Sequence, residues 1–370
     1  MKLTPEEARV HRIERFDTGG PYSSPSDEKL CWIRVPEAPM RLSGFAWYER
    51  EKIFRRLPQK PEWPVTRDVD GLAWHTAGGQ LAFRTDSPCL ALRVTLSAPP
   101  DAWNMAPTGQ CGFDCYFGEP FQQRYMATSR LVIGQASYES WLFELLPNTP
   151  RTLTLNFPLY MGVKEIQMGL APGAKLEVPP AWSLPGPVVV YGTSITQGAS
   201  ASRPGLCYTN LLSRKFNAEF INLGFSGSGK GEPEVAKVIR EIPNPALFVL
   251  DFDSNIRETH LLKERWPNFI KLLREKHPRV PMLALSKPPF MTETHHPEVT
   301  RYRLERRDFL RELVAQCQRD GDARIAFLDG GTLYGDDWHE CTTDQRHATD
   351  LGFARMAEHI APVLQSLLER

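Results

Sequence analysis

The segment Val188-Val-Val-Tyr-Gly-Thr-Ser-Ile-Thr196 decides how the second half of the chain is interpreted. A short run of β-branched and aromatic residues that ends at a glycine is typical of a buried strand followed by a turn. Similar apolar runs follow at 220–223, 247–250, 282–285 and 325–328, and amphipathic stretches at 260–277, 301–318 and 351–368 predict helices. Strands that alternate with helices predict an α/β fold, with a parallel five-stranded sheet and helices on both faces.

Polar or glycine-containing segments follow several of the predicted strands. Residues 191–196 follow the first strand, residues 222–230 the second, and residues 251–255 the third. A fourth segment, residues 342–350, lies between the last strand and the final helix. Because open parallel sheets bind ligands at the carboxyl ends of their strands, we expect these segments to meet at one edge.

Ser194 is the candidate nucleophile, because a strand-to-helix turn exposes a hydroxyl group beside unpaired backbone amides. A serine hydroxyl needs a base before it can attack an acyl carbon at neutral pH. His347 is the candidate base, and Asp344 three residues earlier could orient its ring and stabilise the imidazolium. The amides of Ser194 and Gly227 and the side chain of Asn255 are candidate donors to an oxyanion.

Each of these residues also has a purely structural interpretation. A serine in such a turn often caps the next helix, and Asn255 could do the same. Gly227 could serve a tight turn, and the Asp-x-x-His spacing is common by chance. The order of the residues favours chemistry, since each candidate follows its own predicted strand.

Together these segments resemble the SGNH, or GDSL-type, hydrolase family over roughly residues 186–370. The blocks that carry the resemblance are Gly192-Thr-Ser-Ile195, Asn222-Leu-Gly-Phe-Ser-Gly227, the segment ending in Asn255, and Asp344-x-x-His347. The resemblance implies a flavodoxin-like hydrolase fold, a triad of Ser194, His347 and Asp344, and an oxyanion hole from Ser194, Gly227 and Asn255. Thr193 stands where the family usually has aspartate, and Asp253-Ser-Asn255 replaces the more usual Gly-x-Asn-Asp run.

The first half of the chain has the character of β-structure. Short segments at 79–85, 89–96, 112–117, 130–133 and 151–157 are separated by Pro, Gly, Asp or Asn, and several alternate apolar with polar residues. This spacing predicts a β-sandwich. The proline-rich stretch 178–187 reads as a linker, so we expect an accessory domain over residues 1–180 and a catalytic domain over residues 186–370.

A second, shorter resemblance lies within this first half. Gly112-Phe-Asp-Cys-Tyr116 is similar to the Gly-x-Asp-Leu-Tyr motif of a β-rich domain found with some GDSL-type hydrolases. Cys115 stands where leucine is usual. The resemblance implies that the domain helps to shape the active-site entrance. Asp114 is interpreted as a turn-former, with a substrate contact as the alternative.

Two rival functions remain open at this point. Gly224–Lys230 fits the pattern Gly-x-x-x-x-Gly-Lys of a phosphate-binding loop, with a helix predicted over 232–242, although Gly231 replaces the Ser or Thr that would hold magnesium. The other rival is a carbohydrate-binding protein without catalysis, in which Trp74, Trp103 and Trp141 stack on sugar rings; core packing is the commoner role of tryptophan.

Composition limits the partners and the chemistry. Lysine plus arginine and aspartate plus glutamate number 44 each, so the balance of charge gives no reason to expect nucleic acid or an anionic membrane. No stretch approaches the ~20 apolar residues of a membrane span. His295 and His296 lie near Glu293 without the spacing of helical metal ligands. The mixed charges of residues 301–312 predict a solvated helix face with local ion pairs.

The sequence therefore predicts a serine esterase that needs no cofactor and acts on a small-molecule or oligosaccharide ester. The family resemblance implies O-acetyl groups on a carbohydrate as the first substrate class to consider. The charged N-terminus does not read as a secretory signal, and the seven scattered cysteines favour reduced thiols, so we expect a cytoplasmic protein. Exposed strands would permit edge pairing into a homo-oligomer.

Overall fold

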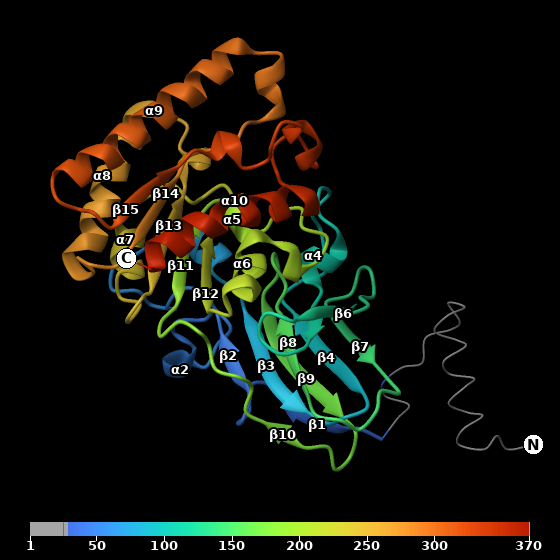
Figure 1. The fold of residues 1–370 in the computed structure, drawn as a ribbon. Coiled ribbons are helices and arrows are strands. Elements are labelled where there is room, and N and C mark those ends of the chain that lie inside the picture. Colours follow the sequence, from blue (N-terminus) through green and yellow to red (C-terminus); the bar gives the residue numbers. More distant parts are fainter. Residues whose placement is uncertain (1–24, 26–28, 370) are drawn as a thin grey trace, which may run out of the picture.

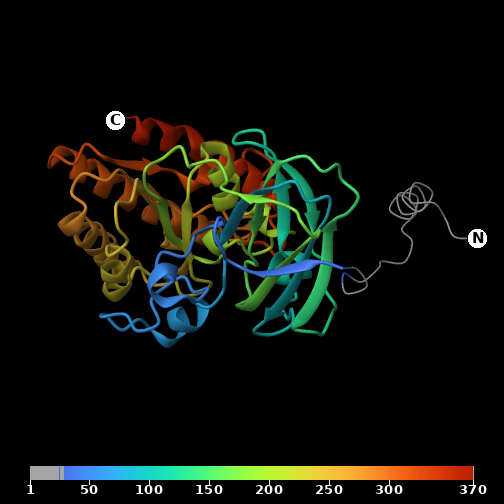
Figure 2. The same cartoon turned by 90° about the horizontal axis from the view of Figure 1, so that it is seen from below.

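The computed structural model describes residue 25 and residues 29–369. Of the first 28 residues of the predicted accessory domain, only residue 25 is described. The expectation that the N-terminus is not a secretory signal therefore concerns residues outside the described part of the chain. Within them the chain forms an α/β half and a β-rich half that lie side by side (Figures 1 and 2). The predicted fold class is thereby confirmed.

The α/β half is built on one parallel sheet of five strands in the order β12-β11-β13-β14-β15. Almost every residue in the first four of these strands is buried, which explains why each one reads as a continuous apolar run. Three of the strands extend one residue further than predicted, and two match their predicted bounds. The five strands are β11 (Val188–Gly192), β12 (Phe220–Gly224), β13 (Leu247–Asp251), β14 (Met282–Leu285) and β15 (Ile325–Leu328).

Helices cover both faces of this sheet. Alternate strand residues such as Val189 and Tyr191 pack in one core cluster with α7, α8 and α9, whereas Val188 and Val190 pack in a second cluster with α6 and α10. The three long helices agree with the predicted ones apart from their ends. The helices of this half are α5 (Ser194–Gln197), α6 (Tyr208–Phe216), α7 (Pro233–Ile239), α8 (Thr259–Lys276), α9 (Pro297–Arg319) and α10 (Asp350–Leu368).

The β-rich half contains two antiparallel sheets that share one core. One sheet has the order β1-β9-β4-β7, and the other has the order β10-β3-β8-β5-β6 with β2 paired to β3. Apolar residues of β3, β4 and β8 meet in a single cluster, as expected for a sandwich. The strands are β1 (Cys31–Arg34), β2 (Arg41–Ser43), β3 (Gln80–Thr85), β4 (Leu90–Leu96), β5 (Asp114–Phe117), β6 (Arg124–Thr128), β7 (Ser137–Phe143), β8 (Arg151–Asn156), β9 (Val163–Leu170) and β10 (Leu176–Glu177).

The strand predicted over residues 130–133 is wrong. This segment is a loop between β6 and β7, and the amide of Gln135 donates to the carbonyl of Val132 at 3.1 Å. Gly134 adopts a φ of 80°, which favours glycine and turns the chain. Val132 and Ile133 are 46% and 70% exposed, so their apolar character does not mark a buried strand.

The segment between β2 and β3 packs partly against the α/β half and partly against the sandwich core. It contains the short helices α2 (Tyr48–Glu51) and α3 (Arg67–Leu72), and Leu57 and Val69 belong to the same core cluster as α7 and α8. Arg56 is fully buried and donates to the carbonyls of Asn222 at 3.2 Å and Gly224 at 2.5 Å. It therefore fixes the carboxyl end of β12 from outside the sheet.

Asp114 forms a second connection between the halves. Its carboxylate accepts hydrogen bonds from the Gly205 amide at 2.7 Å, Arg203 at 2.9 Å and Asn156 at 2.7 Å. It begins β5, follows α4 (Pro107–Cys111), and has no exposed surface. Asp114 is thus neither a turn-former nor a substrate contact: it is a buried acceptor that ties the sandwich to the loop before α6.

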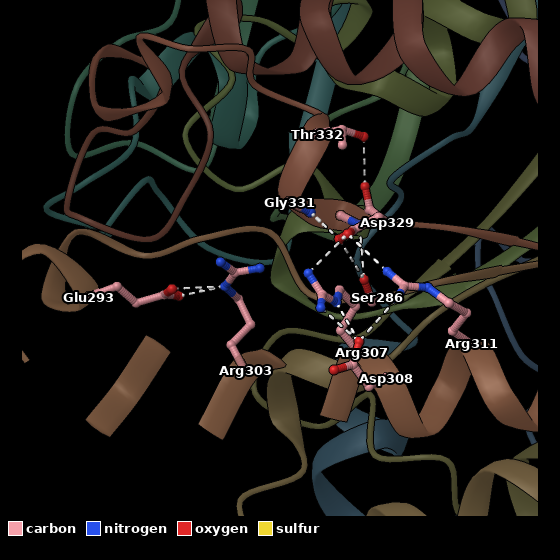
Figure 3. A network of polar contacts seen from close by, with 10 residues as sticks. Ser286, Glu293, Arg303, Arg307, Asp308, Arg311, Asp329, Gly331 and Thr332 are labelled. Carbon is pink, nitrogen blue, oxygen red and sulfur yellow. Dashed lines mark hydrogen bonds and ion pairs between the residues drawn. The ribbon is translucent and has the colours of Figure 1, made fainter. Parts of the chain in front are cut away.

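The charged face of α9 is less solvated than predicted, because it is tied to loops at the carboxyl edge of the sheet (Figure 3). Arg303 donates to both carboxylate oxygens of Glu293, at 3.0 and 2.8 Å, and both side chains are largely buried. Arg307 and Arg311 lie 3.5 and 3.6 Å from the Asp329 carboxylate, which follows β15. Local pairs within the helix are also present, as between Arg311 and Asp308.

Candidate active site

Ser194 lies where β11 ends and α5 begins. Gly192 allows this turn, since a Cβ there would lie 2.0 Å from Thr196 Oγ1 and 2.7 Å from the Asp251 carbonyl oxygen. Thr193 precedes the helix, and its hydroxyl oxygen accepts from the Ile195 amide at 3.3 Å. The residue that departs from the family pattern therefore caps the turn, a role that threonine performs well.

The structure brings Ser194, His347 and Asp344 together. Ser194 Oγ lies 2.8 Å from His347 Nε2, and His347 Nδ1 lies 2.7 Å from Asp344 Oδ2. The Asp344 Oδ1 atom accepts from the His347 backbone amide at 2.8 Å, so the Asp-x-x-His turn closes on itself. This geometry lets the ring take a proton from the serine while the carboxylate holds the ring in place.

Asp344 is held in its charged form. Burial alone would raise its pKa, but hydrogen bonds from the His347 amide, the His347 ring and Asn104 outweigh burial and lower the pKa to about 2. The carboxylate is therefore ionised across the neutral range, as a partner for an imidazolium must be.

Asn104 is a site residue that the sequence did not reveal. Its side-chain amide donates to Asp344 Oδ2 at 2.6 Å, and its carbonyl oxygen accepts from the Ser200 hydroxyl at 2.9 Å. It belongs to the loop before α4, some 240 residues away from its partner along the chain. No local pattern marks an isolated asparagine in such a loop, so only the tertiary structure identifies it.

The predicted oxyanion donors face the same cavity as the serine. Gly227 has a φ of 69°, and the position of a Cβ there is open space, which leaves its backbone accessible. The side chain of Asn255 makes no hydrogen bond within the described chain, and its Oδ1 is buried. Both residues line one cavity with Ser194 and His347, and the group of Asn255 that would donate to a bound ester is its Nδ2 amide, not the buried Oδ1.

Asn255 is fixed by a buried ion pair beneath it. Arg306 of α9 lies 2.5 Å from the carboxylate of Asp253 and donates to the carbonyls of Asp253 at 2.8 Å and Ile256 at 2.6 Å. Each of the two paired side chains is 2% exposed. Asp253-Ser-Asn255, the segment that differs from the family pattern, thus forms a 3-10 turn that Arg306 holds in place.

A second layer of polar residues lies on the protein side of Ser194 and α5. Tyr160 donates its hydroxyl to the Ser194 carbonyl at 3.2 Å, and Gln197 accepts from the Ser226 amide at 3.0 Å while contacting His75 at 3.0 Å. Burial, and then the nearby Arg56 charge, lower the pKa of His75 to about 4. His75 is therefore neutral at physiological pH.

Asp251 is a buried carboxyl group beside this layer. It lies at the end of β13 opposite Gly192 and accepts from Thr196 Oγ1 at 2.8 Å and the Tyr208 hydroxyl at 3.3 Å. Burial raises its pKa to about 7, despite the two hydrogen bonds.

The cavity beside Ser194 has a volume of about 720 Å³. Polar and charged groups dominate its wall, with a smaller apolar part. The residues that line it are Ser194, Ile195, Ser226, Gly227, Lys230, Ser254, Asn255, Ile256, Arg257, Glu258, Leu261, Arg265, Phe290, Arg346 and His347.

The structure also places the residues of the rival interpretations. Gly227 and Lys230 line the same cavity as Ser194, and α7 begins only at Pro233, so the Gly224–Lys230 loop does not open directly into a helix as a phosphate-binding loop would. Trp141 is buried, whereas Trp74 and Trp103 are 41% and 85% exposed.

Metal-binding and membrane-spanning features are absent from the described residues. These residues contain no group of three or more His, Cys, Asp or Glu side chains arranged to hold a metal ion, and this includes the surroundings of His295 and His296. Among the same residues, none of the helices combines the length and apolar character needed to cross a bilayer.

Comparison with known families gives two matches along the chain. Residues 186–365 match the family described as GDSL-like lipase/acylhydrolase. Residues 30–176 match the GxDLY family, described as the N-terminus of SGNH-hydrolase-type esterases. None of the curated proteins matches the chain.

Solved structures show the same arrangement of both halves. A crystal structure described as a GDSL-like lipase from Bacteroides ovatus is 28% identical, with a TM-score of 0.84 over 92% of this chain and 98% of the other. The salicylyl-acyltransferase SsfX3 from a tetracycline biosynthetic pathway is 20% identical, with a TM-score of 0.74 over 91% and 97%. An acetyl xylan esterase from Butyrivibrio proteoclasticus shares the fold at 10% identity, with a TM-score of 0.54 over 92% and 100%.

Proposed function

Because residues 186–365 belong to the GDSL-like lipase/acylhydrolase family and the chain is thereby an esterase, we propose that it cleaves short-chain acyl esters with Ser194 as the nucleophile. The observation that carries this proposal is the continuous contact from Ser194 Oγ to His347 Nε2 at 2.8 Å and from His347 Nδ1 to Asp344 Oδ2 at 2.7 Å. A serine, a base and an orienting carboxylate in this geometry are suited to acyl transfer.

In the first half-reaction, His347 accepts the Ser194 proton as the serine oxygen attacks the ester carbonyl carbon. The carbonyl oxygen becomes an oxyanion, and the Ser194 amide, the Gly227 amide and the Asn255 side chain donate to it. His347 then gives its proton to the departing alkoxide, so an alcohol leaves and an acyl-serine remains.

In the second half-reaction, His347 takes a proton from a water molecule that attacks the acyl-serine. The same three donors hold the second oxyanion. Collapse of this intermediate releases the acid and returns the proton to Ser194 Oγ. Asp344 stays ionised throughout, because its pKa of about 2 lies far below neutrality.

An acetyl ester of a carbohydrate or a small metabolite is the substrate class that we propose. The acetyl xylan esterase from Butyrivibrio proteoclasticus shares the two-part fold, which supports this class by analogy. In this chain Trp103 is 85% exposed and is the neighbour of Asn104, which contacts Asp344. An exposed indole in the loop that carries Asn104 would suit stacking on a sugar ring.

The test is hydrolysis of para-nitrophenyl acetate, butyrate and octanoate by the full chain, with ATP turnover measured alongside. We expect turnover to be highest on acetate and to fall by about 10⁴-fold or more in Ser194→Ala, because the triad acts as a unit. Ser366→Ala is the matched control, since this exposed serine lies on α10 outside the cavity.

Full activity in a clean preparation of Ser194→Ala would refute the assignment of the nucleophile. ATP hydrolysis that disappears in Lys230→Ala, without any ester hydrolysis, would instead support the phosphate-binding interpretation of the Gly224–Lys230 loop.

A further inference from the structure

The cavity beside Ser194 is strongly basic although the chain as a whole is neutral. Lysine plus arginine equal aspartate plus glutamate over the full sequence. The cavity wall nevertheless contains the cations Lys230, Arg257, Arg265 and Arg346 and a single carboxylate, Glu258. The oxyanion has its own donors, so the proposed reaction does not account for this local excess of positive charge.

Among the described residues, Arg265 is the cation of this group that has a carboxylate partner. It donates to the Lys230 carbonyl at 2.7 Å and lies 3.9 Å from the Glu232 carboxylate. This arrangement fixes the backbone of the loop that ends at Lys230. Arg265 therefore positions the backbone of Lys230, and the Glu232 carboxylate balances part of the Arg265 charge.

The other three cations have no carboxylate partner within the described residues. The Lys230 side chain is half-buried, yet its ammonium group makes no hydrogen bond or ion pair there. Arg257 and Arg346 are exposed at the rim, and Arg346 lies 5.9 Å from the centre of the Phe290 ring. A half-buried cation without a partner has lost part of its hydration, and no protein group replaces the lost hydrogen bonds. A bound anion would replace them.

Apolar side chains complete the same cavity. Ile195, Ile256, Leu261 and Phe290 line it together with the three cations. Glu293 holds the Phe290 amide at 3.1 Å and is itself paired with Arg303, so this part of the wall is supported by the network of Figure 3. The cavity thus combines a surface for a carbon skeleton with cations for a negative group.

We infer that the ester cleaved at Ser194 carries a carboxylate, which Lys230 binds with help from Arg257 and Arg346. The inference rests on the proposed function, because it assigns the substrate class of that same site. An acetylated acidic sugar would place its carboxylate on these cations. With acetyl as the acyl part, the carboxylate belongs to the alcohol part of the ester, and the experiment separates this arrangement from a carboxylate on the acyl part.

The experiment compares kcat/KM for matched anionic and neutral esters at low ionic strength. Para-acetoxybenzoate against para-acetoxybenzamide places the charge on the alcohol part, and monophenyl succinate against phenyl butyrate places it on the acyl part. We expect an anionic preference of about ten-fold in one pair, as for a single charge-assisted contact in a half-buried site. Added salt should reduce that preference, because screening weakens exposed charge pairs.

Lys230→Met should remove most of the preference, whereas Lys271→Met should preserve it. Lys271 is an exposed lysine of α8 that does not line the cavity, so it controls for the loss of one positive charge. A ratio of one or less in both pairs would overturn the inference, while hydrolysis of the neutral esters that depends on Ser194 would leave the proposed function standing.

A binding measurement tests the inference without turnover. Titration calorimetry of Ser194→Ala with benzoate and with benzamide compares an anion with its neutral match in the same cavity. Tighter binding of benzoate that is lost in the double variant Ser194→Ala, Lys230→Met supports the carboxylate site. Equal or weaker binding of benzoate overturns it, even if no ester of the panel is hydrolysed.

Discussion

Replacement of Asn104 by alanine tests whether the β-rich half takes part in catalysis. The variant removes the hydrogen bond from Asn104 to Asp344 Oδ2, which measures 2.6 Å. A hydrogen bond to a charged group contributes about 1.5–3 kcal/mol. Asp344 keeps donors from the His347 ring and from the amides of Arg346 and His347, so we expect the lower end of this range.

A loss of about 1.5 kcal/mol in the transition state corresponds to a roughly ten-fold lower kcat. KM should change little, because Asn104 contacts the orienting carboxylate and is not part of the cavity wall. The pKa of Asp344 should rise towards its ordinary value but stay well below neutrality, so the ten-fold loss should be constant between about pH 6 and pH 9. The assay is the pH profile of kcat on para-nitrophenyl acetate.

Asn148→Ala is the matched control, since this asparagine is exposed in the same half of the protein. Asn104→Asp should lose more activity than Asn104→Ala, because a second carboxylate beside Asp344 repels it. If Asn104→Ala keeps kcat within two-fold of the unmodified protein, the reasoning that Asn104 positions the triad is refuted.

Two further predictions concern stability. Asp114→Ala should lower the free energy of unfolding by about 3–5 kcal/mol, because it leaves Arg203 and the Gly205 amide without their buried acceptor. Denaturant titration measures this loss, with the exposed Asp308→Ala as the control. A loss in Asp114→Ala no larger than the loss in the control would contradict the prediction. The pKa of Asp251 is about 7 when folded, above its ordinary value of 3.8, so the unmodified protein should lose stability as pH rises between about 4 and 7. Asp251→Asn lacks this titration and should gain roughly 2–4 kcal/mol relative to the unmodified protein between pH 5 and pH 8; parallel stability curves for the two proteins would contradict the buried carboxyl argument.

The parallel sheet was predictable because four of its five strands are buried on both faces. All five residues of β11 and of β12 are buried, so each appears in the sequence as an uninterrupted apolar run. The sandwich strands were harder to find, since solvent contact breaks their pattern. Residues Lys164 and Glu165 interrupt β9, and every residue of β6 is at least partly exposed.

The candidate site also has residues that the sequence predicts and residues that it does not. Ser194 and Asn255 lie at or just after strand ends, and Asp344 and His347 lie in the segment before α10, positions that the alternation of strands and helices reveals. Asn104 reaches the site from a loop of the other half, and this contact has no signature along the chain. The basic cavity was also missed, because Arg257 and Arg346 are far apart in sequence and meet only in the folded protein.

The buried contacts of Arg56 and Asp114 have a consequence for how the protein is made. Both residues leave the ribosome before their partners, since Arg56 binds carbonyls of residues 222 and 224 and Asp114 binds residues 203 and 205. Before the α/β half is made, Arg56 has only the carbonyls of His75 and Leu72 as acceptors and Asp114 has only Asn156 as a donor, so both charged groups are still partly hydrated. Synthesis of the α/β half removes that water, so the first half reaches its final form only after the second has emerged.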